Sequence, residues 1–205
     1  MDDWKLREFA ASLASEAPTP GGGGAAALCG ALAASLCAMA SRLTARRKTY
    51  ADRTEALSAI IAHADALRLK LLELIDEDAE GFKPLAAAYS LPKDEPNAAA
   101  LLRDATLNAC KAPLAMLRSV CETMALLEQA ADICSPLLLS DVGCGAALAA
   151  AAMDCAVLNI YVNTRTLPQD AESEALEKEA GRLLDEYRPR AEALSACVLR
   201  RLHGI

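Results

Sequence analysis

Aromatic residues are scarce in this chain, at 3%, although 54% of its residues are hydrophobic. Ala and Leu supply most of the apolar side chains, and both favour helices over strands. No segment shows the alternating or β-branched pattern of a strand, apart from residues 157–162, for which helix remains the default interpretation. The sequence therefore predicts an all-α fold, a single-domain helical bundle of roughly seven to nine helices over residues 1–205.

Basic residues are fewer than acidic ones, with 21 Lys and Arg against 28 Asp and Glu, so the formal net charge is -7. This balance argues against broad attraction to nucleic acid or to anionic lipid. We expect no nucleic-acid partner and no membrane surface. A small anionic substrate would need a local basic patch.

Metal-binding patterns are missing, because the eight cysteines include no C-x-x-C pair and the two histidines, His63 and His203, are far apart in sequence. We expect no metal site, and most thiols should be small buried hydrophobic groups. The chain also opens without a basic stretch followed by an apolar core. This start predicts a cytoplasmic protein.

Long runs without charge are present, and the first extends from Gly21 to Ser41, about the length that crosses a bilayer. It consists mostly of Ala, Gly and Ser, which gain little free energy in a membrane, and a second run from Val142 is broken by Asp154. The preferred interpretation is a central helix whose small side chains let neighbouring helices approach closely.

Helical periodicity covers most of the chain, with breaks at Pro and Gly clusters. The predicted helices are 2–15, 24–46, 49 to beyond 78, 97–131, 140–163 and 171–203. Pro113 should kink a helix or start a new one, and Pro189 should kink or interrupt the last. In the third helix an apolar seam with alternating spacings of three and four leads from Leu57 to Asp78, which predicts that this carboxylate points toward the core or a site.

Three groups of residues could carry chemistry. Gly21 to Gly24 form a loop that feeds a helix start, where free N–H groups could hold an anion or a flat ligand; a merely flexible loop is an equal alternative. Cations at the end of the following helix could hold a carboxylated ligand or only offset the helix dipole. The cluster consists of Arg42, Arg46, Arg47, Lys48 and Arg53. Among polar residues, Asp78 and Asp141 are proton-shuttle candidates, with N-cap as the alternative for Asp141. Asn159 and Asn163 share a helical face and could donate hydrogen bonds to a heterocycle, with a surface pair as an equal alternative.

The stretch from Phe9 to Thr44, with its Pro-Thr-Pro-Gly-Gly-Gly-Gly turn and Ala-rich continuation, resembles the opening signature of the formiminotetrahydrofolate cyclodeaminase and methenyltetrahydrofolate cyclohydrolase family. Further segments recur in the family's order, so the resemblance covers roughly residues 5–170. They are Asp-Ala-Glu-Gly-Phe at 78–82, Leu-Pro-Lys at 91–93, Ala-Pro-Leu at 112–114, Ser-Asp-Val-Gly at 140–143 and Asn-Ile-Tyr-Val-Asn at 159–163.

The resemblance implies a helical enzyme that forms a homodimer or a larger homo-oligomer, acts on a tetrahydrofolate derivative and needs no cofactor. It would either hydrolyse 5,10-methenyltetrahydrofolate to the 10-formyl compound or deaminate 5-formiminotetrahydrofolate to the methenyl compound. Without a fused formiminotransferase domain, we expect hydrolysis slightly more than deamination. The resemblance implies Asp78, Asp141 and Lys48 as catalytic residues. It implies as substrate-binding residues Pro20, Gly21, Gly22, Gly23, Arg46, Arg47, Tyr50, Asn159 and Asn163.

Two departures from the family pattern bear on activity. Ala45-Arg46-Arg47 stands where the family often has Gly-Lys, and Ile133 to Pro136 replaces a region where a Gly-Asn pair is common. An alternative to an enzyme is therefore a non-catalytic helical folate-binding or scaffold protein of the same fold.

Overall fold

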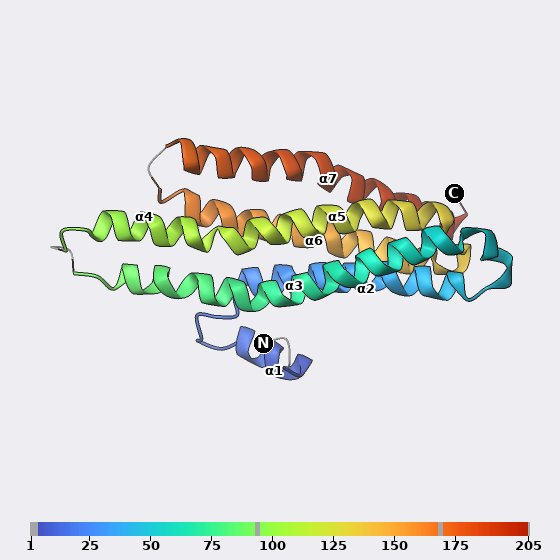
Figure 1. Ribbon diagram of the computed structural model, residues 1–205, viewed down its shortest axis with the longest axis horizontal. Coiled ribbons are helices and arrows are strands. Elements are labelled where there is room, and N and C mark those ends of the chain that lie inside the picture. The colour runs from blue at the N-terminus through green and yellow to red at the C-terminus, as the bar shows by residue number, and fades with distance from the viewer. Residues whose placement is uncertain (1–3, 93–94, 168–169, 205) are drawn as a thin grey trace.

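The computed structural model describes residues 4–92, 95–167 and 170–204, and these form a bundle of long helices (Figure 1). The α-helices are α1 (Leu6–Leu13), α2 (Gly22–Ala45), α3 (Thr54–Tyr89), α4 (Ala98–Ala109), α5 (Lys111–Ile133), α6 (Leu139–Thr164) and α7 (Ala171–His203), with short 3-10 helices η1 (Lys48–Arg53) and η2 (Pro136–Leu138). No strand occurs in these ranges. The all-α prediction is confirmed.

The predicted count of seven to nine helices is slightly too high. Only Cys110 separates α4 from α5, and its backbone is right-handed helical (φ -82°, ψ -14°), so the two form one nearly continuous rod (Figure 1). The described chain thus has six helical rods. Pro113 occupies the first turn of α5, where its missing N–H is tolerated, in agreement with the helix start predicted there. Pro189 does not interrupt α7, and Pro84 likewise lies inside α3.

The core is built around α2, which contacts α3, α5 and α6. Small side chains permit this close packing. A Cβ on Gly30 would lie 2.7 Å from Val120 Cγ2, and one on Gly145 would lie 2.7 Å from Leu127 Cδ2. Glycine is therefore required where α2 and α6 cross α5.

Two helical segments, Gly22–Ala45 and Pro136–Thr164, are long and apolar enough to cross a membrane. Core helices pass the same test, and 61% of the apolar window of the first and 44% of that of the second are buried within the protein itself. Length and composition are therefore weak evidence for membrane spanning. The lower value for the second shows that much of the α6 surface is uncovered.

The apolar seam predicted on α3 is confirmed: Leu57, Leu71 and Leu74 are fully buried. The helices α2 and α6 run in opposite directions, because the start of α2 at Gly22 lies beside Asn159 and its middle, at Ala33, lies beside Gly145. The bundle therefore has two distinct ends. We call the end with Gly22 and Asn159 the glycine end, and the end where α2 finishes the basic end.

The N-caps of α6 and α7 were not those expected from the sequence: one expected cap is replaced, and one was not foreseen. Asp141 is not the N-cap of α6, because the helix already begins at Leu139 and Leu138 is the N-cap; Asp141 lies in the first turn, where a negative charge is still favourable. Asp170 caps α7 by accepting hydrogen bonds from Glu172 N and Ser173 N. The predicted helix start at Asp2 and Lys93 of the Leu-Pro-Lys motif lie outside the described residues.

Candidate functional site

A pocket opens at the glycine end, between the start of α2, the middle of α3, the junction of α4 with α5, and the end of α6. It has a volume of about 210 Å³. Its lining residues are Pro18, Thr19, Gly21, Gly22, Gly23, Asp78, Phe82, Ala109, Pro113, Asn159, Val162 and Asn163. The structure thus gathers Gly21 to Gly23, Asp78, Asn159 and Asn163 from the predicted site into one cavity.

The glycines provide space, not unusual backbone angles. Gly21 is extended (φ -118°, ψ -151°), α2 begins at Gly22, and Gly204 is the one described residue with positive φ. The described backbone of this turn therefore uses no dihedrals that are closed to other residues. A Cβ on Gly23 would lie 2.5 Å from the carboxyl carbon of Asp78, so only glycine lets α2 approach this acid.

Pro20, another predicted binding residue, packs against the first turn of α2. It is buried, and its Cβ lies 3.0 Å from the position that a Cβ on Gly24 would occupy. Pro20 therefore packs under the first turn of α2 and does not line the pocket.

Asp78 is the one charged side chain that lines the pocket among the described residues. It is half-buried, and burial raises the pKa of its carboxyl group to about 6. No described residue offers it a hydrogen bond or an ion pair. An unpartnered carboxyl group that titrates near neutrality can both accept and donate a proton there.

The two asparagines of α6 face the pocket with defined partners. Asn159 Nδ2 donates to the carbonyl oxygen of Cys155 at 2.8 Å, which leaves Oδ1 available as an acceptor. Asn163 hydrogen-bonds the buried Cys110 thiol; burial raises the pKa of this thiol to about 11, and the contact with Asn163 opposes that shift. Asn159 can therefore accept a hydrogen bond from a ligand N–H group.

The apolar walls of the pocket were missed by the sequence reasoning. Phe82, Pro113 and Val162 line the pocket together with the polar groups. Phe82 could have been found, because it follows Asp78 by four residues on the same helix and so shares its face. Pro113 and Val162 come from other helices, and their positions depend on how the bundle packs.

The remaining predicted residues lie at the basic end. They follow the last turn of α2 and are Arg46, Arg47, Lys48 and Tyr50. The whole of α2 is about 35 Å long at 1.5 Å per residue, so these residues lie far from the glycine end. Asp141 also lies toward that end, in the first turn of α6. One chain therefore does not bring Asp141 or the basic residues to Asp78.

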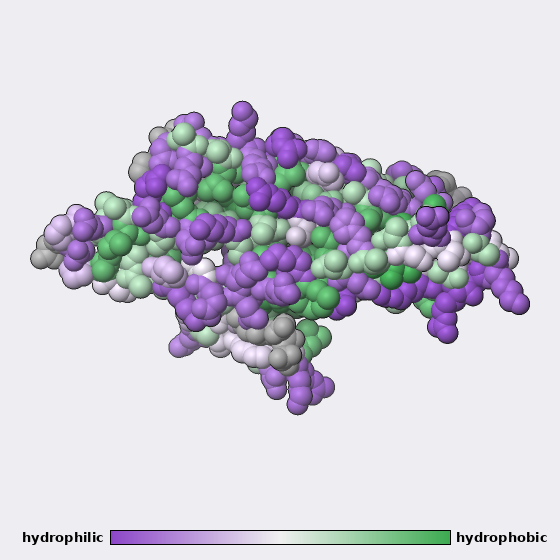
Figure 2. Space-filling view, in the orientation of Figure 1, coloured by the Kyte–Doolittle hydropathy of each residue, from purple (hydrophilic) through white to green (hydrophobic). Residues whose placement is uncertain are grey.

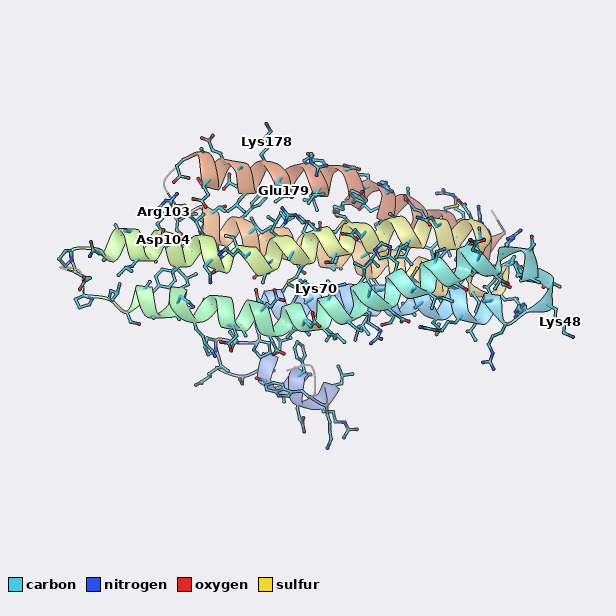
Figure 3. The ribbon with its side chains drawn as sticks, viewed as in Figure 1. Lys48, Lys70, Arg103, Asp104, Lys178 and Glu179 are labelled. Atoms are coloured by element: carbon cyan, nitrogen blue, oxygen red, sulfur yellow. The ribbon has the colours of Figure 1, made fainter. Side chains whose placement is uncertain are left out.

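Most cations of the basic end are held within the chain. Arg42 pairs with Asp65, Arg47 Nη1 donates to Ser135 Oγ at 3.2 Å, and Arg53 Nη1 donates to the Ile133 carbonyl oxygen at 3.0 Å. The Arg53 guanidinium also lies 5.3 Å from the centre of the Tyr50 ring. Arg46 and Lys48 are exposed and have no side-chain partner among the described residues, and Figure 3 shows Lys48 directed away from the bundle.

Across residues 4–92, 95–167 and 170–204, no group of three or more His, Cys, Asp or Glu side chains could hold a metal ion. The pocket offers one carboxylate, two amides and the first N–H groups of α2. Such an arrangement suits a flat polar ligand and proton transfer.

Comparison with known proteins gives consistent results. Residues 5–182 match the family model described as formiminotransferase-cyclodeaminase. The chain is 38% identical over 185 residues to a methenyltetrahydrofolate cyclohydrolase of Methylorubrum extorquens, covering 88% of this chain and 89% of that one. It is 28% identical to a formimidoyltransferase-cyclodeaminase of Sus scrofa, covering 97% of this chain but 37% of that longer protein. The crystal structure of a formiminotetrahydrofolate cyclodeaminase from Thermotoga maritima superposes with a TM-score of 0.84 at 27% identity, covering 99% of this chain and 98% of that one.

Proposed function

The chain belongs to the formiminotransferase-cyclodeaminase family, and from this premise we propose that it is an enzyme that acts on a one-carbon-loaded tetrahydrofolate. Hydrolysis of 5,10-methenyltetrahydrofolate to 10-formyltetrahydrofolate is the preferred reaction. The similarity to a methenyltetrahydrofolate cyclohydrolase supports this choice. Its identity of 38% exceeds those to the cyclodeaminases compared above, and the match spans nearly the whole of both chains. The single observation that carries the proposal is an unpartnered, half-buried Asp78 facing the start of α2.

The pocket suits the heterocyclic part of a folate. Phe82, Pro113 and Val162 provide apolar walls for a flat ring, and the ring's edge can reach Asn159 Oδ1. The first N–H groups of α2 favour negative or electron-rich oxygen atoms of the ligand. Together these groups would orient the ring and exclude water from one side of it.

Asp78 would move the protons that hydrolysis requires. As a carboxylate it accepts a proton from the water that adds to the carbon bridging N5 and N10, which gives a neutral tetrahedral carbon. It then returns this proton to N5 while the bond from that carbon to N5 breaks. The hydroxyl proton leaves to solvent as the formyl carbonyl forms on N10, so the reaction releases one proton overall.

The second candidate reaction is cyclodeamination, favoured by the likeness to a formiminotetrahydrofolate cyclodeaminase over nearly the full length of both chains. N10 would attack the formimino carbon, and the proton of N10–H would pass to the formimino nitrogen. A second proton, from an acid, would let that nitrogen leave as ammonia while the methenyl cation forms. The reacting carbon again lies between N5 and N10. In this case Asp78 would first act as the acid.

Assays with both substrates decide between these reactions. Purified protein should remove the absorbance of methenyltetrahydrofolate if it is a hydrolase, and should generate that absorbance from formiminotetrahydrofolate if it is a cyclodeaminase. Asp78→Asn should lose activity by about 100-fold or more, since proton transfer contributes that much. Glu73→Gln, which removes an exposed acid from the same helix, is the matched control and should retain activity.

A non-catalytic folate-binding or scaffold protein is the alternative. Folate binding without turnover of either substrate would support it, and turnover that Asp78→Asn abolishes would remove it. We further propose that the enzyme uses no cofactor beyond its folate substrate and works in the cytoplasm. Activity after exhaustive chelation and dialysis, and the location of a tagged chain in cells, test these two points.

A further inference from the structure

The backbone carbonyl group of Ala109 lacks a hydrogen-bond donor among the described residues. In a helix its oxygen would accept from the N–H group of the fourth residue along, which here is Pro113 and has no N–H. Proline in the first turn of an isolated helix costs no hydrogen bond. In this chain α4 runs almost directly into α5, so a carbonyl group precedes the proline and loses its partner.

The backbone around this carbonyl group is well bonded. The N–H group of Cys110 donates to the carbonyl oxygens of Thr106 and Leu107, at 3.2 Å in each case. The N–H group of Leu114 donates to the carbonyl oxygen of Cys110 at 3.1 Å. The oxygen of Ala109 is therefore passed over at a junction whose other hydrogen bonds continue.

This unpaired carbonyl group belongs to the wall of the pocket. Ala109 is 8% exposed, and it lines the pocket together with Pro113. A helical carbonyl group points along the helix toward the residue four positions ahead, so the oxygen of Ala109 lies between two residues of the wall. Buried carbonyl groups nearly always have a partner, and at a helix end this partner can be a ligand.

The ring of a folate offers suitable donors. Its pyrimidine part carries an amino group and a ring N–H group, at the edge that lies farthest from the carbon between N5 and N10. In the pocket Asp78 is assigned to proton transfer, and Asn159 Oδ1 is one further acceptor. The oxygen of Ala109 is a third. The identity of the ligand rests on the proposed function, whereas the unpaired carbonyl group does not.

We infer that the carbonyl oxygen of Ala109 accepts a hydrogen bond from the amino group of the folate pyrimidine ring, and that Pro113 keeps this oxygen free. Any other residue at position 113 has an N–H group that competes for the same oxygen. Pro113 is thus a specificity-determining residue, which gives the Ala-Pro-Leu segment at 112–114 a role. Replacing this proline should weaken ligand binding, although most replacements favour a helix.

A second proline inside a helix provides the matched control. Pro84 in α3 deprives the carbonyl group of Glu80 of its usual donor in the same way. Pro84 is exposed and lines a separate groove with Leu91 and Leu101. The groove lies toward the free end of α3 and α4, where Figure 2 shows apolar side chains at the surface. Pro84→Val therefore adds one N–H group to a helix without changing the pocket.

Amide exchange tests the position of the carbonyl group without any ligand. Pro113→Val keeps an apolar side chain of similar size and adds an N–H group, which should bond to the oxygen of Ala109 and exchange slowly with solvent. NMR measures this exchange, and circular dichroism checks that helical content is retained. Pro113→Ala is the second variant if Pro113→Val does not fold. Fast exchange at position 113 in a folded variant overturns the inference.

Ligand binding tests the specificity. The probes are 5-formyltetrahydrofolate, a stable reduced folate, and its counterpart with a methyl group in place of the pyrimidine amino group. Calorimetry with the wild type should give a Kd about 10-fold higher for the methyl counterpart, because one hydrogen bond is lost. Pro113→Val should bind 5-formyltetrahydrofolate about 10-fold more weakly than the wild type does and should bind the two probes nearly equally. Pro84→Val should bind both probes as the wild type does.

The outcomes separate this inference from the proposed function. A wild type that binds both probes equally overturns the inference, and this measurement needs no variant. Pro113→Val with the full preference of the wild type also overturns it, because another acceptor, such as Asn159 Oδ1, then holds the amino group. In both cases the proposed function stands if the wild type turns over its substrate. A wild type that binds no reduced folate contradicts the proposed function, and the inference falls with it.

Discussion

The carboxyl group of Asp78 lies directly against the α-carbon of Gly23, so that a Cβ at this position would be 2.5 Å from the carboxyl carbon. The acid of α3 and the start of α2 therefore approach as closely as a glycine permits. This contact fixes where the pocket lies and holds the carboxylate, half-buried, at a helix start.

The glycine turn should respond to alanine in graded order. Gly23→Ala must displace Asp78 and should lower turnover by about 100-fold, comparable with loss of a general acid or base. Gly22→Ala meets Asn159 Nδ2 at 3.1 Å and should cause a smaller loss, because a side-chain amide can shift. Gly21→Ala, whose Cβ meets only the Pro18 carbonyl oxygen at 3.8 Å, should remain active. Steady-state turnover of the three variants at matched thermal midpoints measures this, and equal losses at all three positions would refute it.

The pH dependence of kcat/KM should report the carboxyl group of Asp78. If the reaction is hydrolysis, the carboxylate is the required form, so kcat/KM should rise with pH to a plateau with a midpoint near pH 6, since burial raises the pKa of Asp78 to about 6. If the reaction is cyclodeamination with Asp78 as the acid, kcat/KM should instead fall through the same pH. Residual activity of Asp78→Asn should lack this step. A wild-type profile that is flat from pH 5 to 7 would exclude Asp78 from the proton transfers.

Local helix pattern was sufficient to predict most of the fold. The seam from Leu57 to Leu74 and its continuation to Asp78 depend only on periodicity along one helix, so both could be read from the sequence. The ends of the last helix were predicted correctly, but the interruption considered at Pro189 is absent. Pro189 in α7 and Pro84 in α3 both stay inside helices because packing on the bundle compensates for a lost hydrogen bond, which propensity alone does not reveal.

The candidate site was only partly predictable, for a geometric reason. Neighbours along the chain, such as Arg46 and Lys48, seemed to belong with the glycine turn, but the length of α2 separates them from it. The walls Pro113 and Val162 arrive from α5 and α6, and no sequence spacing encodes that meeting. The contact between Gly23 and Asp78 likewise depends on how α2 packs against α3.

Two glycines inside helices should respond to alanine in opposite directions. Gly145→Ala should destabilise the protein by about 1–3 kcal/mol, because its Cβ would lie 2.7 Å from Leu127 Cδ2 in the core. Gly181→Ala on α7 should be neutral or stabilise by up to about 1 kcal/mol, since its nearest neighbour is the Tyr161 hydroxyl at 3.4 Å and alanine favours helix. Chemical denaturation of both variants measures the difference. If Gly181→Ala lowers the free energy of unfolding and Gly145→Ala leaves it unchanged, α5 and α6 do not pack as closely at Gly145 and Leu127 as described above.

Removing the charge of Asp78 should stabilise the protein, and increasingly so as pH rises. Burial raises the pKa of this carboxyl group from 3.8 to about 6, so the folded chain holds the proton more tightly than the unfolded chain does. Between these two values the folded state binds more protons, and the free energy of unfolding therefore falls as pH increases. The full shift would correspond to about 3 kcal/mol, and the partial exposure of Asp78 reduces the expected cost at neutral pH to about 1–2 kcal/mol.

Asp78→Asn lacks this cost, so its stability relative to wild type should be similar below about pH 4 and should rise to a plateau above about pH 6. Glu73→Gln on the same helix controls for the loss of one negative charge from an acidic chain. The measurement is the free energy of unfolding of the three proteins across this pH range. The prediction fails if the difference in this free energy between Asp78→Asn and wild type is the same at low and at neutral pH, or if Asp78→Asn is less stable than wild type at neutral pH. Either result would show that the carboxylate has a stabilising partner and is not poised for proton transfer.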